Sequence, residues 1–291
     1  MSRLFAFGLG YSAQVLAARL SAKGWQIAGT ARDEANIARL RAQGYEMMRF
    51  GGELDNREVA KLLHGTTHLL HSIPPGHGDP VLAQYRQDIG LLGSIEWIGY
   101  LSTVGVYGDQ KGRWVDETAE PKPNSDRTEA RAEAEQAWLD FGEETSIPVQ
   151  IFRLAGIYGP GRNVFDKLSA GKARRIKKNG QVFSRIHVED IATVLEASIV
   201  HPRACAIYNV ADDEPAAPDE VVAYAAKLIG VPPPPEVAFE EADLSPMARS
   251  FYEESRRISN TRIKSELGVR LRYPTYREGL ASLLPTTVSG A

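Results

Sequence analysis

Short apolar runs recur along the first half of the chain, separated by stretches in which apolar residues return every three or four positions. Such runs are typical of strands buried on both faces of a parallel sheet, and the stretches between them are typical of the amphipathic helices that cover it. The alternation predicts an α/β fold with a doubly wound parallel sheet. The runs assigned to strands are Leu4–Phe7, Trp25–Gly29, His68–Ile73, Trp97–Leu101 and Val149–Leu154.

The pattern changes in the second half of the chain. Ser125 is a helix-capping residue type, and the apolar stripe that follows it predicts a helix to about Glu144. After a Gly-Pro-Gly sequence at 159–161 the periodicity loosens. Residues 182–188 and 206–210 are then strand-like, residues 191–200 are helical, and four prolines at 232–235 indicate a rigid connector.

The turn after the first strand carries the clearest chemical signal. It lies within residues 3–29, the span of one βαβ unit, where Gly8 permits a sharp turn, Gly10 lets the backbone approach a pyrophosphate, and Ala13 lets helix and sheet pack closely. The N–H groups of the helix then face the anion. We therefore predict a dinucleotide site, and the turn residues expected at the cofactor are Gly8, Gly10, Tyr11, Ser12 and Ala13.

The end of the second strand bears on which nicotinamide cofactor is bound. Sites selective for NAD place an acid about 20 residues beyond the glycines, where it accepts hydrogen bonds from the ribose 2′-hydroxyl. Residues 26–31 contain no acid, and Arg32 follows them. A guanidinium suits a 2′-phosphate, so we expect NADP in preference to NAD, with NAD still possible. Asp33 could cap a helix or contact the ribose.

Composition excludes several classes of partner. The chain has 291 residues, 43% of them hydrophobic, with a formal net charge of −3 and a pI near 6.1. This balance provides no long-range attraction for nucleic acid or an anionic membrane, and no run of eighteen apolar residues or export signal is present. We expect a cytoplasmic protein that binds a small-molecule substrate or ligand, with neither nucleic acid nor membrane as partner. The single cysteine, Cys205, is expected to be packed in the core.

Four further motifs follow in order, and together with the turn they resemble the extended short-chain dehydrogenase/reductase family, the NAD-dependent epimerase/dehydratases. The likeness extends to about Val210. It implies a Rossmann domain with a smaller C-terminal substrate domain, divided as 1–158 (dinucleotide-binding), 159–185 (substrate segment), 186–212 (return to the Rossmann domain) and 213–291 (substrate domain). The motifs are Leu101-Ser102-Thr103-Val104-Gly105-Val106-Tyr107-Gly108, Arg153-Leu154-Ala155-Gly156-Ile157-Tyr158-Gly159-Pro160-Gly161-Arg162, Arg185-Ile186-His187-Val188-Glu189-Asp190-Ile191-Ala192 and Tyr208-Asn209-Val210.

The resemblance assigns roles to individual residues. It places the family's catalytic Ser or Thr at Thr103, four residues before Tyr107, with its hydroxyl on a substrate oxygen. Without the resemblance, a role in satisfying backbone groups at a strand end would be the better interpretation. Further cofactor contacts are implied around the adenine after the third strand and where the fourth strand passes the cofactor. These residues are Glu53, Leu54, Ser72, Ile73 and Pro74.

One element of the family pattern is broken. The Tyr-x-x-x-Lys motif is expected about twenty residues beyond Tyr107, where this chain has Arg127 and Arg131. In that motif a phenol exchanges a proton with the substrate oxygen as hydride moves. A guanidinium stays protonated at any useful pH, so Arg127 cannot be that base. Arg131 could still replace the lysine at the nicotinamide ribose.

Three interpretations stay open for this break. Another phenol, Tyr107 or Tyr158, supplies the proton, or Arg127 polarises a carbonyl while water or substrate supplies it. Alternatively, the protein binds NADP(H) and a ligand without turnover, as a sensor or regulator. In the third interpretation Arg127 is a solvated helix residue and the motif is misplaced. We favour the first: an enzyme acting by hydride transfer on a sugar-like or other hydroxy/carbonyl molecule.

The remaining candidates are weaker. A basic run at 172–178 could bind a phosphate or nucleotide-sugar, although such runs are more often solvated surface. His68 and His71 fall on one strand three positions apart and so point to opposite faces, and we predict no metal site. His77 lies on a glycine-rich loop and is interpreted as a surface residue. A homodimer is possible by analogy with the family.

Overall fold

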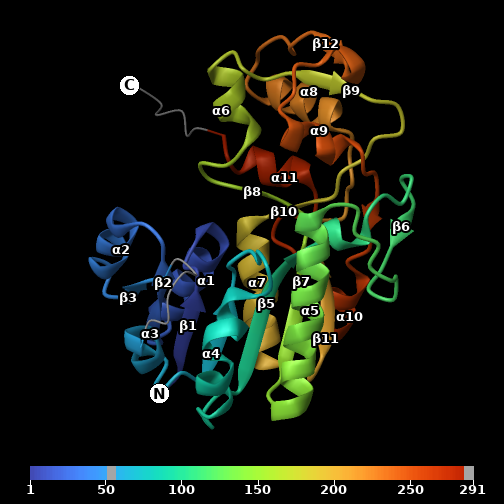
Figure 1. Cartoon of the computed structure of the whole chain (residues 1–291). Coiled ribbons are helices and arrows are strands. Elements are labelled where there is room, and N and C mark those ends of the chain that lie inside the picture. The colour runs from blue at the N-terminus through green and yellow to red at the C-terminus, as the bar shows by residue number, and fades with distance from the viewer. Residues whose placement is uncertain (51–56, 285–291) are drawn as a thin grey trace, which may run out of the picture.

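Figure 1 shows the computed structural model, which describes residues 1–50 and 57–284. Seven strands form one sheet in the order β11-β7-β5-β4-β1-β2-β3, and every neighbouring pair is parallel. The order runs outward from β1 in both directions, so the predicted doubly wound sheet is confirmed. The strands are β1 (Arg3–Phe7), β2 (Gln26–Ala31), β3 (Glu46–Arg49), β4 (His68–His71), β5 (Trp97–Thr103), β7 (Val149–Leu154) and β11 (Ala206–Val210).

Helices cover both faces of this sheet, because its strands present apolar residues on each side. In β1, Leu4 and Ala6 join one buried cluster, whereas Phe5 and Phe7 join the other. The first face is covered by α1 (Tyr11–Ala22), α2 (Glu34–Arg41), α7 (Val188–Val200) and α10 (Thr261–Leu267), and the second by α3 (Arg57–Leu62), α4 (Pro80–Gly90) and α5 (Asp126–Thr145). Among the described residues, no helix is long and apolar enough to cross a bilayer.

A smaller region stands over the carboxyl ends of the sheet strands (Figure 1). It has its own buried cluster, which includes Tyr158, Phe165, Val221, Tyr276 and Leu280. Short parallel pairs β8–β10, β9–β12 and β6–β13 connect its segments. The elements outside the seven-stranded sheet and its covering helices are η1 (Val104–Tyr107), β6 (Trp114–Val115), β8 (Gly156–Tyr158), α6 (Val164–Ser169), β9 (Arg175–Lys177), β10 (Arg185–His187), α8 (Pro218–Leu228), β12 (Glu236–Ala238), η2 (Phe239–Glu241), α9 (Pro246–Tyr252), β13 (Arg257–Ile258) and α11 (Tyr276–Ala281).

Several details differ from the pattern predicted by the sequence. The short strand β3 was not among the predicted runs, and the strand expected over residues 182–188 is limited to β10. The stretch 213–291, expected to serve one substrate domain, contributes to both parts, because Ile263 and Leu267 of α10 join the core of the sheet. The two histidines of β4 do point to opposite faces: His68 contacts Trp25, whereas His71 contacts Trp138.

Candidate functional site

The turn between β1 and α1 is built by its two glycines. Gly8 has a φ of +80°, its N–H donates to Thr30 Oγ1 at 3.0 Å, and a Cβ there would lie 2.9 Å from Ile73 Cγ1. Gly10 is the N-cap of α1, and no side chain caps that helix. The N–H groups of the first turn are therefore available to an anion, as a dinucleotide-binding turn requires.

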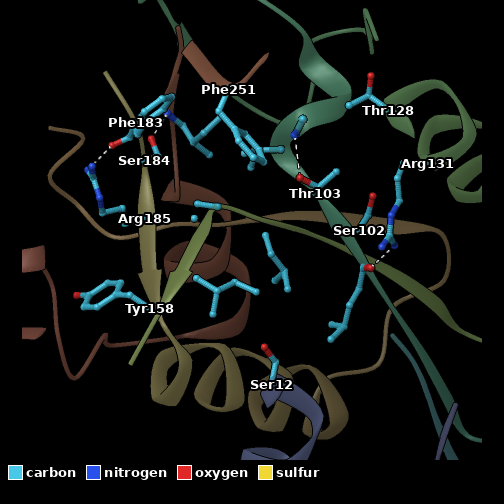
Figure 2. Close-up of a pocket in the computed structure, with 18 of the residues that line it drawn as sticks. Ser12, Ser102, Thr103, Thr128, Arg131, Tyr158, Phe183, Ser184, Arg185 and Phe251 are labelled. Atoms are coloured by element: carbon cyan, nitrogen blue, oxygen red, sulfur yellow. Dashed lines mark hydrogen bonds between the residues drawn. The ribbon is translucent and has the colours of Figure 1, made fainter. Parts of the chain in front are cut away.

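A cavity of about 790 Å³ begins at this helix terminus and extends under the smaller region. Figure 2 shows that its walls come from the end of β5, the start of α5, the segment around β8 and β10, and α9. The sheet thus supplies one wall and the smaller region the other. The lining residues are Gly10–Ala13, Ser72, Leu101–Gly105, Arg127, Thr128, Arg131, Leu154–Tyr158, Arg162, Phe183–Arg185, Ala248, Phe251, Tyr252, Glu254, Arg256 and Ile258.

Thr103 stands at the carboxyl end of β5 and faces this cavity (Figure 2). Its Oγ1 accepts a hydrogen bond from the Gly105 N–H at 3.1 Å, which caps the short helix η1. The hydroxyl proton remains available to an oxygen of a ligand, because a hydroxyl can donate while it accepts. Its neighbour Ser102 instead donates to Glu135 at the back of the strand.

Both arginines at the broken motif lie on the cavity wall. Arg127 and Arg131 are one turn apart in α5, so they share a face of the helix. Arg131 Nη1 donates to the Leu101 carbonyl at 2.8 Å and to the Tyr100 hydroxyl at 3.1 Å. Arg127 is exposed, and its guanidinium lies 5.1 Å from the centre of the Phe251 ring.

Known proteins resemble this chain in family and in sequence. A model of the NAD dependent epimerase/dehydratase family matches residues 94–211. The chain is also 31% identical to Protein YeeZ of Escherichia coli (strain K12), covering 94% of this chain and 97% of that protein. The chain belongs to the NAD-dependent epimerase/dehydratase family.

Solved structures resemble this chain over nearly its whole length. A functionally unknown conserved protein from Silicibacter pomeroyi is 50% identical, with a TM-score of 0.88 over 97% of this chain and 98% of that chain. MoeE5 in complex with UDP-glucose and NAD is 21% identical, with a TM-score of 0.75 over 97% of each chain, and so shares the fold.

Two tyrosines considered as replacements for the missing phenol have other partners in this family member. Tyr107 is fully buried, donates to Asn209 Oδ1 at 2.8 Å and is absent from the cavity lining. Its hydroxyl is therefore engaged outside the cavity, and a catalytic role for Tyr107 stays a prediction that this geometry does not favour. Tyr158 lines the cavity, but its hydroxyl is directed to the Thr275 carbonyl at 3.5 Å, away from Thr103 (Figure 2).

The environments of these phenols also oppose ionisation. Burial raises the pKa of Tyr107, although the guanidinium of Arg153 lies 4.7 Å from its ring centre. Burial, together with the carboxyls of Asp212 and Asp190, raises the pKa of Tyr158 strongly. Neither hydroxyl has the lowered pKa of a phenol that exchanges protons near neutral pH.

The other residues expected at the cofactor fall into three groups. Ser72 lines the cavity and donates to the Gly8 carbonyl, and Ile73 packs where a Gly8 side chain would stand. Arg32 and Pro74 are exposed and lie outside the cavity lining. Glu53 and Leu54 lie outside the described residues. Asp33 caps α2 by accepting from the Ala35 N–H at 3.0 Å.

The site also contains residues that the sequence did not single out. Phe251 and Tyr252 of α9, together with Arg256, come from the part of the chain beyond the family motifs, where only an Arg-rich composition was visible. The basic run lies elsewhere: none of its lysines and arginines lines this cavity, and Arg175 pairs with Glu236 at 2.7 Å.

The cavity is strongly cationic. Five arginines line it, and Glu254 is its one acidic side chain among the described residues. Glu254 is paired with Arg256 at 2.5 Å. The remaining four guanidiniums form no ion pair within the described part of the chain. In a protein of net charge −3, this concentration of positive charge indicates anionic ligands.

Proposed function

We propose that this protein is an NADP(H)-dependent oxidoreductase of the epimerase/dehydratase type, acting by hydride transfer on a small hydroxy or carbonyl compound. One observation carries the proposal: the uncapped start of α1 and the Thr103, Arg127 and Arg131 side chains line the same cavity. The structural likeness to MoeE5, which is described in complex with UDP-glucose and NAD, supports a nicotinamide cofactor.

The residues present fit such a cofactor. Residues 8–13 would hold the pyrophosphate at the helix terminus, since a Cβ on Gly10 would meet no atom closer than 3.8 Å and that side of the turn is open. Arg131 would hold the nicotinamide ribose, and exposed Arg32 the 2′-phosphate that distinguishes NADP from NAD. When bound, the cofactor donates or accepts the hydride.

The protein's own residues then stabilise charge on the substrate oxygen. Thr103 would donate its hydroxyl proton into a hydrogen bond with that oxygen, and Arg127 would add a fixed positive charge to the same cavity. Because a guanidinium keeps its proton, the proton that reaches the oxygen comes from water or from the substrate itself. This route uses neither Tyr107 nor Tyr158.

A second function is favoured by the same substitution. With a permanently protonated Arg127 where the family has an acid–base phenol, the site could bind NADP(H) and a ligand without chemistry, as a sensor. The two functions share the cofactor and differ in turnover. Residues 159–185, with the part of 213–291 that packs in the smaller region, would hold the substrate or ligand in either case.

The deciding experiment follows the hydride. Native mass spectrometry of freshly purified protein and titration of tryptophan fluorescence with NADPH and NADH establish the cofactor. A panel of carbonyl compounds is then incubated with NADPH carrying deuterium at the transferable position. We expect deuterium in a product, with turnover retained in the Tyr107→Phe, Tyr158→Phe double variant. Loss of turnover in that variant would restore the phenol route, and cofactor binding without turnover would favour the sensor.

A further inference from the structure

The end of the cavity beyond Thr103 has an apolar, largely aromatic surface. Phe183 precedes β10, and Phe251 and Tyr252 end α9, with Ile258 of β13 beside them. Phe251 is 47% exposed, which is unusual for a large apolar side chain beside a cavity. This end is the one farther from the α1 terminus, and it is formed mainly by the smaller region (Figure 2).

Polar side chains of the types that often hydrogen-bond sugar hydroxyls are scarce in the same lining. Within the described residues it includes no Asn, Gln, Asp, His or Lys. Two of the neutral hydroxyls near Thr103 are already engaged: Ser102 donates to Glu135, and Thr128 bonds Ser125 within the cap of α5. A buried sugar needs several such partners, because each unpaired hydroxyl costs free energy.

Positive charge is available beside this aromatic surface. Arg127 makes no ion pair within the described residues, and its guanidinium faces the Phe251 ring at 5.1 Å. The one carboxylate in the described lining, on Glu254, is paired with Arg256. A guanidinium with free donors next to an aromatic wall matches a carboxylate attached to a flat ring, since it binds carboxylates through two parallel hydrogen bonds.

We infer that the substrate is an aromatic carboxylate that also carries the reacting hydroxyl or carbonyl group, with its carboxylate on Arg127 and its ring against Phe251 and Phe183. The inference rests on the proposed function and specifies its substrate class. It makes Arg127 and Phe251 the residues that determine specificity. It also explains why Arg127 stands where the family has a tyrosine. At this position the protein needs a positive charge that binds the substrate carboxylate, rather than a phenol that transfers a proton.

Calorimetry on protein saturated with NADPH tests this class of ligand. The probes are benzoate, cinnamate and 2-naphthoate, each compared with its neutral amide, and UDP-glucose. We expect at least one acid to bind at least tenfold more tightly than its amide and more tightly than UDP-glucose. Arg127→Gln should reduce the acid-to-amide ratio to within twofold, and Phe251→Ala should weaken acid and amide alike.

A matched control is the exposed Arg270→Gln, which removes a positive charge outside the cavity and should leave the ratio unchanged. NADPH affinity, measured first for every variant, separates two failures. Absence of NADPH binding by the wild-type protein would refute the proposed function itself. Normal NADPH binding with no saturable binding of any acid, or with tighter binding of UDP-glucose, would overturn the substrate class and leave the proposed function standing.

Discussion

At the scale of single residues, the two glycines of the first turn play separable roles. A Cβ at Gly8 would sit at a φ of +80° and 2.9 Å from Ile73 Cγ1, so Gly8→Ala should destabilise the fold by about 1–3 kcal/mol. Gly10 has a φ of −90° and open space beside it, so Gly10→Ala should cost less than about 1 kcal/mol. Urea unfolding of the two variants measures the difference.

The same pair gives a test of cofactor contact. Gly10→Ala should weaken NADPH binding at least tenfold despite its intact fold, because the added methyl occupies the space that the pyrophosphate needs. Fluorescence titration measures the affinity, and the unfolding curve of the same preparation is its control. NADPH affinity equal to that of the wild type would contradict a pyrophosphate at this terminus.

A second prediction concerns cofactor choice. Arg32 is exposed, and Asp33 beside it is already used as the cap of α2. Arg32→Asp should therefore weaken NADPH binding by at least tenfold, since a carboxylate would repel the 2′-phosphate, while NADH binding changes little. Parallel titrations with the two nucleotides measure this selectivity. Equal losses for both would remove the proposed NADP preference.

The sequence predicted site residues where a family motif could be followed along the chain. The resemblance assigned Thr103, Arg127 and Arg131 to the site, and all three line the same cavity. The sequence could not place Tyr107 or Phe251. The direction of Tyr107 depends on Asn209, about a hundred positions away, and Phe251 reaches Arg127 only through packing of the smaller region.

At the scale of elements, one buried ion pair ties α5 to the sheet. Glu135 of α5 accepts from Ser102 of β5 and from Nε and Nη2 of Arg153 of β7, with the closest Arg153 contact at 2.7 Å. Both charged side chains are 3% exposed. The tie fixes the helix that carries Arg127 and Arg131 over the end of the strand that carries Thr103.

Removing one member of this pair should cost much more than removing both. Glu135→Leu leaves the Arg153 guanidinium buried without a countercharge, and we expect a loss of about 3–5 kcal/mol. The Glu135→Leu, Arg153→Leu double variant should be less destabilised than the single variant, because no buried charge remains unpaired. Denaturant unfolding measures both. If the free energy of unfolding of Glu135→Leu lies within 1 kcal/mol of the wild-type value, the pair does not hold α5 in place.

Elements were predictable from sequence to different degrees for physical reasons. The strands buried on both faces stood out as apolar runs, and α5 was predicted nearly to its ends from Ser125 and its stripe. The short strands of the smaller region were not, because two- and three-residue strands such as β13 are held by contacts distant in sequence. The return of α10 to the sheet was likewise invisible, since apolar periodicity does not identify the surface a helix packs against.

At the scale of the whole molecule, the chain crosses from the sheet to the smaller region just after β11, at Asp212. This carboxyl is 1% exposed, its Oδ2 has no hydrogen-bond partner, and its backbone N–H donates to the Arg185 carbonyl at 2.7 Å. Burial raises the pKa of Asp212 to about 8, an effect that the nearby Arg185 charge opposes only in part. The crossing between the two parts therefore contains an acid that is stable in its neutral form.

The free energy of unfolding should consequently depend on pH through the Asp212 carboxyl. Between its unfolded pKa, near 3.8, and about 8, Asp212 is protonated in the folded state and ionised in the unfolded state. The contribution of this group to stability is thus fully present below pH 3.8 and is lost as pH rises to about 8, by at most roughly 1.4 kcal/mol per pH unit. Asp212→Asn keeps a neutral side chain, so its stability relative to wild type should increase from pH 5 to 8 and then level off.

Urea unfolding at each pH measures the difference, with Asp213→Asn, at a partly exposed and Lys264-paired site, as the control. A difference between Asp212→Asn and wild type that stays constant across this range would show that Asp212 ionises as readily in the fold as in the unfolded chain.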